Sequence, residues 1–194
     1  MTLKAKLIAL TAIFITLAAH AEIRTFTISG TVTEASPTAP LGAPVTGTFA
    51  YDTDAIPYFE FIDPNWPRKD AAYLGVPESF RIQVNGHTLV SEIAAVGIMD
   101  YSGDGGGDCL HITGERMTLD GTRFEEGAIG LTLCTTPSNY QVLRSTKLPR
   151  KIHVRRFDWM NYGTAQVNGS STGTILTFHI DRIRAAKPEP DDDD

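Results

Sequence analysis

The chain has 194 residues and a formal net charge of −6, and 42% of its residues are hydrophobic. This length and apolar content are sufficient for one domain with a sizeable core. The excess of acidic residues argues against nucleic acid as a partner, because the phosphate backbone is bound through clustered positive charge.

The first 21 residues have the three parts of a cleavable secretory signal peptide. Lys4 and Lys6 form a basic start, residues 7–19 form an apolar run, and Ala19-His20-Ala21 is a small-residue cleavage site. The apolar run is shorter than the roughly 20 residues of a membrane-spanning helix. We therefore expect an exported protein, periplasmic or extracellular, that keeps no membrane anchor and folds as one domain over residues 22–186.

Alternation of apolar with polar residues dominates the chain after residue 22. Phe26 and Ile28, for example, alternate with threonines, and glycine, proline, asparagine or aspartate interrupts the pattern at short intervals. The clearest local feature is Asn85-Gly86, a strong hairpin turn signal between two alternating stretches, and Asp120-Gly121 marks a second turn. No stretch of the chain has a convincing helical period, so we predict an all-β fold with little helix.

The number and spacing of these strands predict the architecture. Each short strand must bury one face, and two antiparallel sheets packed face to face achieve this. We therefore predict an antiparallel β-sandwich of jelly-roll type. Residues 93–99 are apolar at nearly every position, which is typical of a central strand covered on both sides or of a strand with small residues on its outer face.

Residues 52–76 form the longest insert between the predicted strands and are rich in proline and aromatic residues. One interpretation is a lid packed over an edge of the sandwich. The alternative is an exposed platform on which sugar rings stack, built from Tyr58, Trp66 and Tyr73.

The segment that begins at Asp100 has the spacing of a calcium loop. Oxygen-bearing side chains occupy positions one, three, five and nine, and a glycine occupies position six; the oxygen-bearing residues are Asp100, Ser102, Asp104 and Asp108. His111 stands at position twelve, where a bidentate glutamate normally completes the site. A calcium site and a plain acidic connection between strands are both consistent with this pattern.

The two cysteines, Cys109 and Cys134, are the only ones in the chain. In an oxidising compartment a single pair within one domain favours a structural disulfide. A redox or metal-binding thiol pair would favour a closer spacing.

A basic stretch stands out in this acidic chain. Its members are Arg144, Lys147, Arg150, Lys151, Arg155 and Arg156. On an extended backbone Lys151, His153 and Arg155 would share one face, while Ile152 and Val154 would point to the core. We weigh a solvated surface that balances nearby acids against a patch for an anionic polysaccharide or a lipid headgroup.

The order of several motifs resembles bacterial exported β-sandwich domains found in proteins with the PEP-CTERM sorting signal. The resembling stretches are 26–32, 45–54, 80–89, 105–108 and 173–177. The resemblance implies an exported domain of undescribed activity. The sorting signal itself is absent, because Pro188-Glu189-Pro190 runs directly into four aspartates, and we expect residues 187–194 to form a disordered acidic tail.

The sequence contains no convincing catalytic constellation. The later histidines are scattered, no Gly-x-Ser-x-Gly motif occurs, and Glu125-Glu126 would diverge on a strand. The leading hypothesis is a non-enzymatic exported protein with a binding or structural role and no certain cofactor, calcium being one candidate. The alternatives are a carbohydrate-binding module for an extracellular or cell-surface glycan, which would use the aromatic insert, and a jelly-roll hydrolase.

Overall fold

The structure is a computed structural model that describes residues 22–65, 68–101, 106–139, 141–143, 145–168 and 173–186. The predicted signal peptide and the acidic tail lie outside these residues. Both therefore stay predictions.

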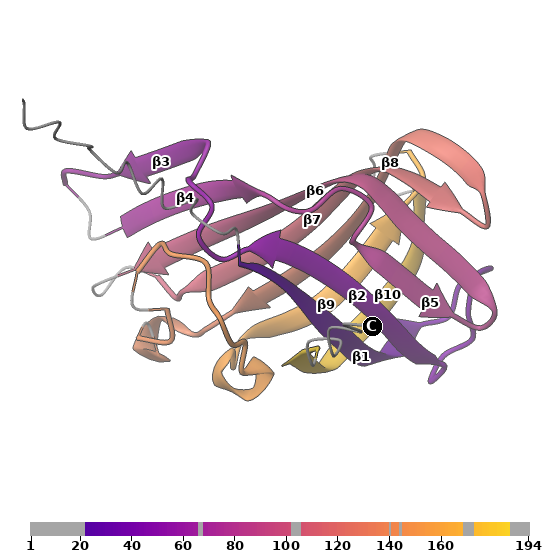
Figure 1. Ribbon diagram of the computed structural model, residues 1–194. Coiled ribbons are helices and arrows are strands. Elements are labelled where there is room, and N and C mark those ends of the chain that lie inside the picture. Colours follow the sequence, from indigo (N-terminus) through magenta and orange to yellow (C-terminus); the bar gives the residue numbers. More distant parts are fainter. Residues whose placement is uncertain are drawn as a thin grey trace, which may run out of the picture.

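Ten antiparallel strands make up most of the described chain (Figure 1). They are β1 (Ile23–Glu34), β2 (Pro44–Asp52), β3 (Phe59–Ile62), β4 (Arg68–Leu74), β5 (Arg81–Val84), β6 (His87–Tyr101), β7 (Cys109–Leu119), β8 (Thr122–Cys134), β9 (Met160–Gln166) and β10 (Thr174–Ala185). The helical content of the described residues is two 3₁₀ turns, η1 (Pro137–Asn139) and η2 (Val154–Arg156). The predictions of an all-β chain and of the Asn85-Gly86 hairpin between β5 and β6 are confirmed.

Eight of the strands close into a barrel in the order β5-β2-β1-β10-β9-β8-β7-β6, with β6 paired to β5 on one side and to β7 on the other. The first and last strands pair along their length, Phe26 opposite Ala185 and Val32 opposite Phe178. The remaining two strands form a β3–β4 hairpin that extends from β6 beside the barrel, and β4 pairs with the last part of β6, residues 95–101.

The predicted β-sandwich of jelly-roll type is therefore wrong. The alternation of apolar and polar residues shows that each strand buries one face. A single sheet that closes into a barrel buries that face as well as two stacked sheets do. The long strand β6 joins β5 and β4 to β7 within one sheet, and the β1–β10 pairing removes the edges that a sandwich would keep. The jelly-roll hydrolase alternative loses its structural premise with this correction.

Side chains fill the barrel interior, as expected for eight strands. Phe26 stacks on Phe49 and on Tyr51, with ring centroids 5.1 and 4.9 Å apart, and the three rings are buried. Phe178 on β10 lies directly over Gly163 on β9. A Cβ atom at residue 163 would stand 2.1 Å from the Phe178 ring, so this close packing requires glycine.

The two ends of the barrel differ. At the hairpin end lie the turns at Asn85-Gly86 and Asp120-Gly121. At the other end β1 begins, β2 and β8 end, and the capping segment, residues 135–159, covers the opening (Figure 1). The described part of the capping segment places five apolar side chains in the main core, namely Leu143, Leu148, Ile152, Val154 and Phe157. We call this the capped end.

Candidate anion-binding groove

A groove of about 720 Å³ lies at the capped end, between the last residues of β10 and residues 151–155 of the capping segment. It exists because β10 is longer than its neighbour: β9 pairs with β10 only over residues 174–179, whereas β1 pairs with β10 as far as Ala185. The register of β1 and β10 shifts at Asp181, which is an extra residue between two paired ones. Such a bulge bends a strand and redirects its side chains.

The groove is lined by cations from both segments. The capping segment contributes Lys151, His153 and Arg155, which are exposed, while Ile152 and Val154 between them are buried. This alternation confirms the predicted sharing of one face, although residues 154–156 form η2 instead of a strand. The opposite wall contributes Arg182 and Arg184 of β10, also exposed.

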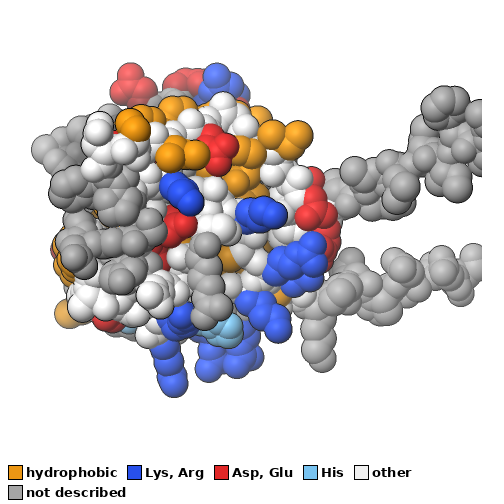
Figure 2. All heavy atoms as spheres, turned by 90° about the vertical axis from the view of Figure 1, so that its left-hand side faces the viewer, with side chains coloured by type: hydrophobic (Ala, Val, Ile, Leu, Met, Phe, Trp, Pro, Cys, Tyr) orange, Lys and Arg blue, Asp and Glu red, His pale blue; other side chains and the backbone are white. Residues whose placement is uncertain are grey.

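These cations have little local neutralisation. Among the described residues, no carboxylate forms an ion pair with Lys151, Arg155, Arg182 or Arg184. The one acidic side chain in the lining, Asp181, accepts a hydrogen bond from the Thr31 hydroxyl at 3.0 Å and lies 3.9 Å from His179. Figure 2, which looks onto the capped end, shows Lys and Arg side chains gathered with a histidine on the lower part of this face.

The backbone that leads into the groove is firmly held. The buried hydroxyl of Tyr51 donates a hydrogen bond to the Pro149 carbonyl at 2.6 Å, and the Tyr73 hydroxyl donates one to the Thr146 carbonyl at 2.8 Å. Burial raises the pKa of both tyrosines, so both hydroxyls remain protonated donors at neutral pH. The capping segment is thus tied to β2 and β4 directly before Lys151.

Arg150 forms ion pairs with acidic side chains, unlike the groove cations. Its guanidinium lies 3.0 Å from Glu22 and 3.5 Å from Asp54, and its carbonyl accepts a hydrogen bond from Arg24. Of the other predicted basic residues, Arg156 donates to the Gln141 carbonyl, Lys147 is exposed, and Arg144 lies outside the described residues. The predicted basic stretch therefore divides into residues that hold the capping segment and residues that face the groove.

The structure does not gather the predicted aromatic platform. Tyr58 is 62% exposed beside β3, whereas Tyr73 on β4 is 4% exposed and belongs to the core. Trp66 lies outside the described residues. An exposed platform at this site therefore cannot include the ring of Tyr73 in the described arrangement.

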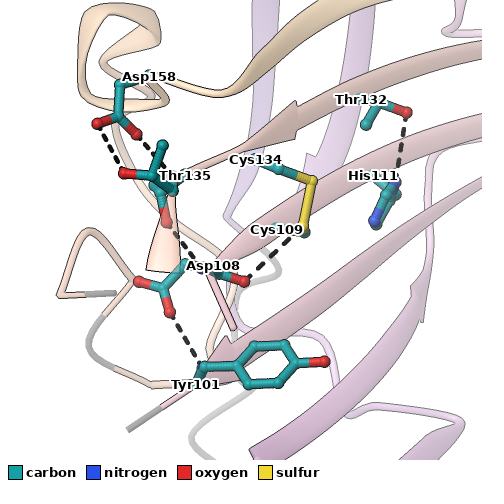
Figure 3. The surroundings of a disulfide bond; sticks show 10 residues. Tyr101, Asp108, Cys109, His111, Thr132, Cys134, Thr135 and Asp158 are labelled. Atoms are coloured by element: carbon teal, nitrogen blue, oxygen red, sulfur yellow. Dashed lines mark hydrogen bonds between the residues drawn. A yellow bond between two sulfur atoms is a disulfide. The ribbon is translucent and has the colours of Figure 1, made fainter. Parts of the chain in front are cut away.

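Two of the predicted calcium ligands, Asp100 and Asp108, are buried near the capped end, and Figure 3 shows the surroundings of Asp108. Asp108 is fully buried: one carboxylate oxygen accepts the Tyr101 amide at 3.0 Å and the other accepts the Leu143 amide at 2.7 Å. The pKa of Asp108 is raised to about 6, chiefly by burial and also by the nearby Asp100, against the effect of these amides. Burial also raises the pKa of Asp100.

Asp108 therefore joins the end of β6 to the capping segment. Ser102 and Asp104 lie outside the described residues. Calcium binding by this loop stays a prediction.

The predicted disulfide between Cys109 and Cys134 is confirmed (Figure 3). The two cysteines are directly opposite each other on β7 and β8, beside Asp108. The ring of His111 lies close to both sulfur atoms, within 4.8 Å. Because the sulfur atoms are bonded to each other, neither is a thiolate that could bind a metal, and His111 instead lies 3.4 Å from the Thr132 hydroxyl.

Comparison with known protein families, with curated proteins and with solved structures finds no match. No helix among the described residues is long and apolar enough to cross a membrane. The groove is therefore interpreted from its own geometry and charge.

The sequence marks one wall of this groove, the basic residues 151–155, but not the other wall, the end of β10. Lys151, His153 and Arg155 stand in a visibly basic stretch, but Arg182 and Arg184 look like ordinary outward residues of the last strand. The one sequence feature that marks them is the break in alternation at Asp181-Arg182, between the core residues Ile180 and Ile183.

Proposed function

We propose that this protein is an exported, non-enzymatic binding protein that holds an anionic group in the groove between β10 and the capping segment. The observation that carries the proposal is the set of four groove cations without an acidic partner among the described residues. In a chain with a net charge of −6, basic side chains have many acidic residues available for pairing. Their grouping around one hollow favours a negatively charged ligand.

The form of the groove agrees with a carboxylate, sulfate or phosphate group on a larger molecule. Arginine presents several donors in a plane that matches such groups, and lysine adds a compact charge. The walls are formed by a strand and by a segment held by two tyrosine hydroxyls, so the backbone that carries the donors is held in place before the ligand arrives.

The test is calorimetric titration of the mature, oxidised chain with inorganic phosphate, glycerol phosphate and polygalacturonate, and with neutral dextran as the uncharged probe. We expect saturable binding of at least one anion and none of dextran. The double variant Lys151→Gln/Arg184→Gln should lose this binding, because it removes one cation from each wall.

The matched control is Arg116→Gln. Arg116 is an exposed arginine near the hairpin end, far along β7 from the groove. Its substitution changes the net charge without changing the groove. Equal loss in the control, or no anion binding by the unchanged protein, would contradict the proposed function.

A further inference from the structure

Seven large apolar side chains are exposed at the capped end. The side chains concerned are Ile23, Ile56, Tyr58, Phe59, Phe61, Ile62 and Trp159, each between 43% and 88% exposed. Most belong to β3 or to the residues that precede it, and Figure 1 shows the β3–β4 hairpin projecting beyond the barrel. Three further large apolar side chains are exposed outside this set, namely Leu41, Leu74 and Tyr162, and Leu41 lies in the turn before β2, away from the capped end.

This apolar surface lies on the same face of the molecule as the groove. Arg150, directly before the groove residue Lys151, contacts Asp54, and Ile56 follows two residues later. Ile23 adjoins Glu22, which also contacts Arg150. Figure 2 shows the two kinds of surface on one face, with apolar side chains on the upper part and basic side chains on the lower part.

The composition of the apolar surface favours lipid over sugar. A sugar platform needs flat aromatic rings, but the most exposed residue is Ile56, at 88%, and Ile23 and Ile62 are 58% and 59% exposed. Branched aliphatic side chains cannot stack on a sugar ring, whereas they enter the boundary between headgroups and acyl chains readily. Tyrosine and tryptophan also prefer that boundary.

The charges are arranged to suit an anionic surface. Near the apolar residues, Glu22, Asp54 and Asp70 are held by arginines, and the groove cations remain available. Exposed acidic side chains also lie toward the hairpin end, at Glu115, Asp120, Glu125 and Glu126. On β3 itself, Glu60 is exposed and forms no ion pair with a described residue. A membrane approached by the capped end would meet the four groove cations, which have no carboxylate partner among the described residues.

We propose that the capped end docks on an anionic phospholipid surface, with Ile56 and the β3 side chains inserted among the headgroups and the groove cations holding lipid phosphate. The inference rests on the proposed anion site, and it assigns the bound anion to the phosphate of a phospholipid headgroup. Apolar insertion and electrostatic attraction each contribute to interfacial binding. Loss of either contribution should therefore weaken docking.

The experiment is vesicle flotation of the full mature, oxidised chain. The vesicles contain phosphatidylcholine alone or phosphatidylcholine mixed with phosphatidylglycerol. We expect flotation with the anionic vesicles and little with the neutral ones. Ile56→Ser/Ile62→Ser should weaken vesicle binding about tenfold, because two exposed aliphatic side chains are removed from the interface, while soluble anions still bind in the groove.

Two controls separate the contributions. Leu41→Ser removes an equally exposed aliphatic side chain away from the capped end and should leave flotation unchanged. Lys151→Gln/Arg184→Gln should weaken flotation and abolish binding of soluble anions. These substitutions are on exposed side chains, so folding should be retained, and circular dichroism checks this.

Several results would overturn the inference while leaving the proposed function intact. One is binding of polygalacturonate in the groove without any vesicle flotation, which would indicate an acidic glycan. Another is a dimer in sedimentation experiments that Ile56→Ser/Ile62→Ser converts to monomer, which would assign the apolar surface to a second copy. Flotation that is indifferent to phosphatidylglycerol and to the groove substitutions would refute the role of the cations.

Discussion

The two tyrosine hydroxyls that hold the capping segment provide the sharpest test of how the groove is built. Tyr51 and Tyr73 lie on different strands, β2 and β4, and donate to carbonyls three residues apart, at Pro149 and Thr146. Replacing each tyrosine by phenylalanine removes one hydroxyl and keeps the ring, which for Tyr51 preserves the stacking on Phe26. Each substitution thus removes only the hydrogen bond that holds the capping segment.

The expected magnitude follows from the surroundings of each bond. A buried neutral hydrogen bond contributes about 1 kcal/mol net, and more when its partner is left without water. Pro149 and Thr146 are half-buried, so water can reach the released carbonyls in part. We expect each single variant to lower the free energy of unfolding by about 1 kcal/mol and the double variant by about 2 kcal/mol.

The assay combines urea unfolding with anion titration. Because the bonded carbonyls of Thr146 and Pro149 lie in the backbone that leads to Lys151, the double variant should also bind anions more weakly than its stability loss alone explains. Tyr58→Phe is the control, since Tyr58 is exposed and its hydroxyl has no hydrogen bond to a described residue. A double variant as stable as the parent, with unchanged anion affinity, would refute the idea that these hydroxyls position the groove.

Four further predictions concern the barrel and the acidic loop. Cys109→Ala/Cys134→Ala should cost about 3 kcal/mol in urea unfolding, because the disulfide closes a loop of 25 residues; a loss well below 1 kcal/mol would contradict this. Gly163→Ala should cost about 1–3 kcal/mol through its clash with the Phe178 ring, whereas Gly130→Ala, whose Cβ would have 3.7 Å of clearance, serves as the tolerated control. The raised pKa of Asp108, about 6 against 3.8, means that the folded state binds this proton more tightly, so its contribution to stability falls as pH rises from about 4 to about 6. The melting temperature of the parent relative to Asp108→Asn should therefore decline across this range, and parallel curves would contradict it. For the predicted calcium loop, added calcium should raise the melting temperature of the parent but not of Asp100→Asn; no change with calcium or with chelator would remove that hypothesis.

Local pairing could be predicted from the sequence because it depends on neighbouring residues. Asn85-Gly86 adopts the positive backbone angles that its turn requires, and Asp120-Gly121 does the same between β7 and β8. The disulfide could be predicted from the expected oxidising compartment and from the presence of only two cysteines in the chain. These features need no knowledge of which distant strands meet.

Closure of the sheet could not be predicted in the same way. Alternation in β1 identifies Phe26 and Ile28 as buried but carries no information about whether they face a second sheet or the far wall of a barrel. The decisive pairing joins β1 to β10, residues separated by about 150 positions. The burial of Tyr73 was missed for a related reason, because its place in the core depends on β4 pairing with β6.

The groove combines a predictable and an unpredictable element. The basic residues 151–155 are visible as a cluster, yet a cluster on an otherwise balanced surface carries little functional meaning. It acquires meaning when the bulge at Asp181 brings Arg182 and Arg184 opposite it. Two individually ordinary patterns, about 30 residues apart, then form one site.

The distribution of charge also favours a binding role for the groove. Cations that gather around one hollow repel one another, and pairing with acids would reduce that cost. The chain makes such pairs elsewhere, as in Arg123 with Glu92 and Arg150 with Glu22. Exposed cations that pair with no described carboxylate, at the same end of the barrel as exposed isoleucines, are unfavourable for an isolated protein in water, and both become favourable on an anionic lipid surface. Removing a groove cation should therefore leave folding stability unchanged or improved while it weakens binding, which is the usual relation between a binding site and the stability of the fold that carries it.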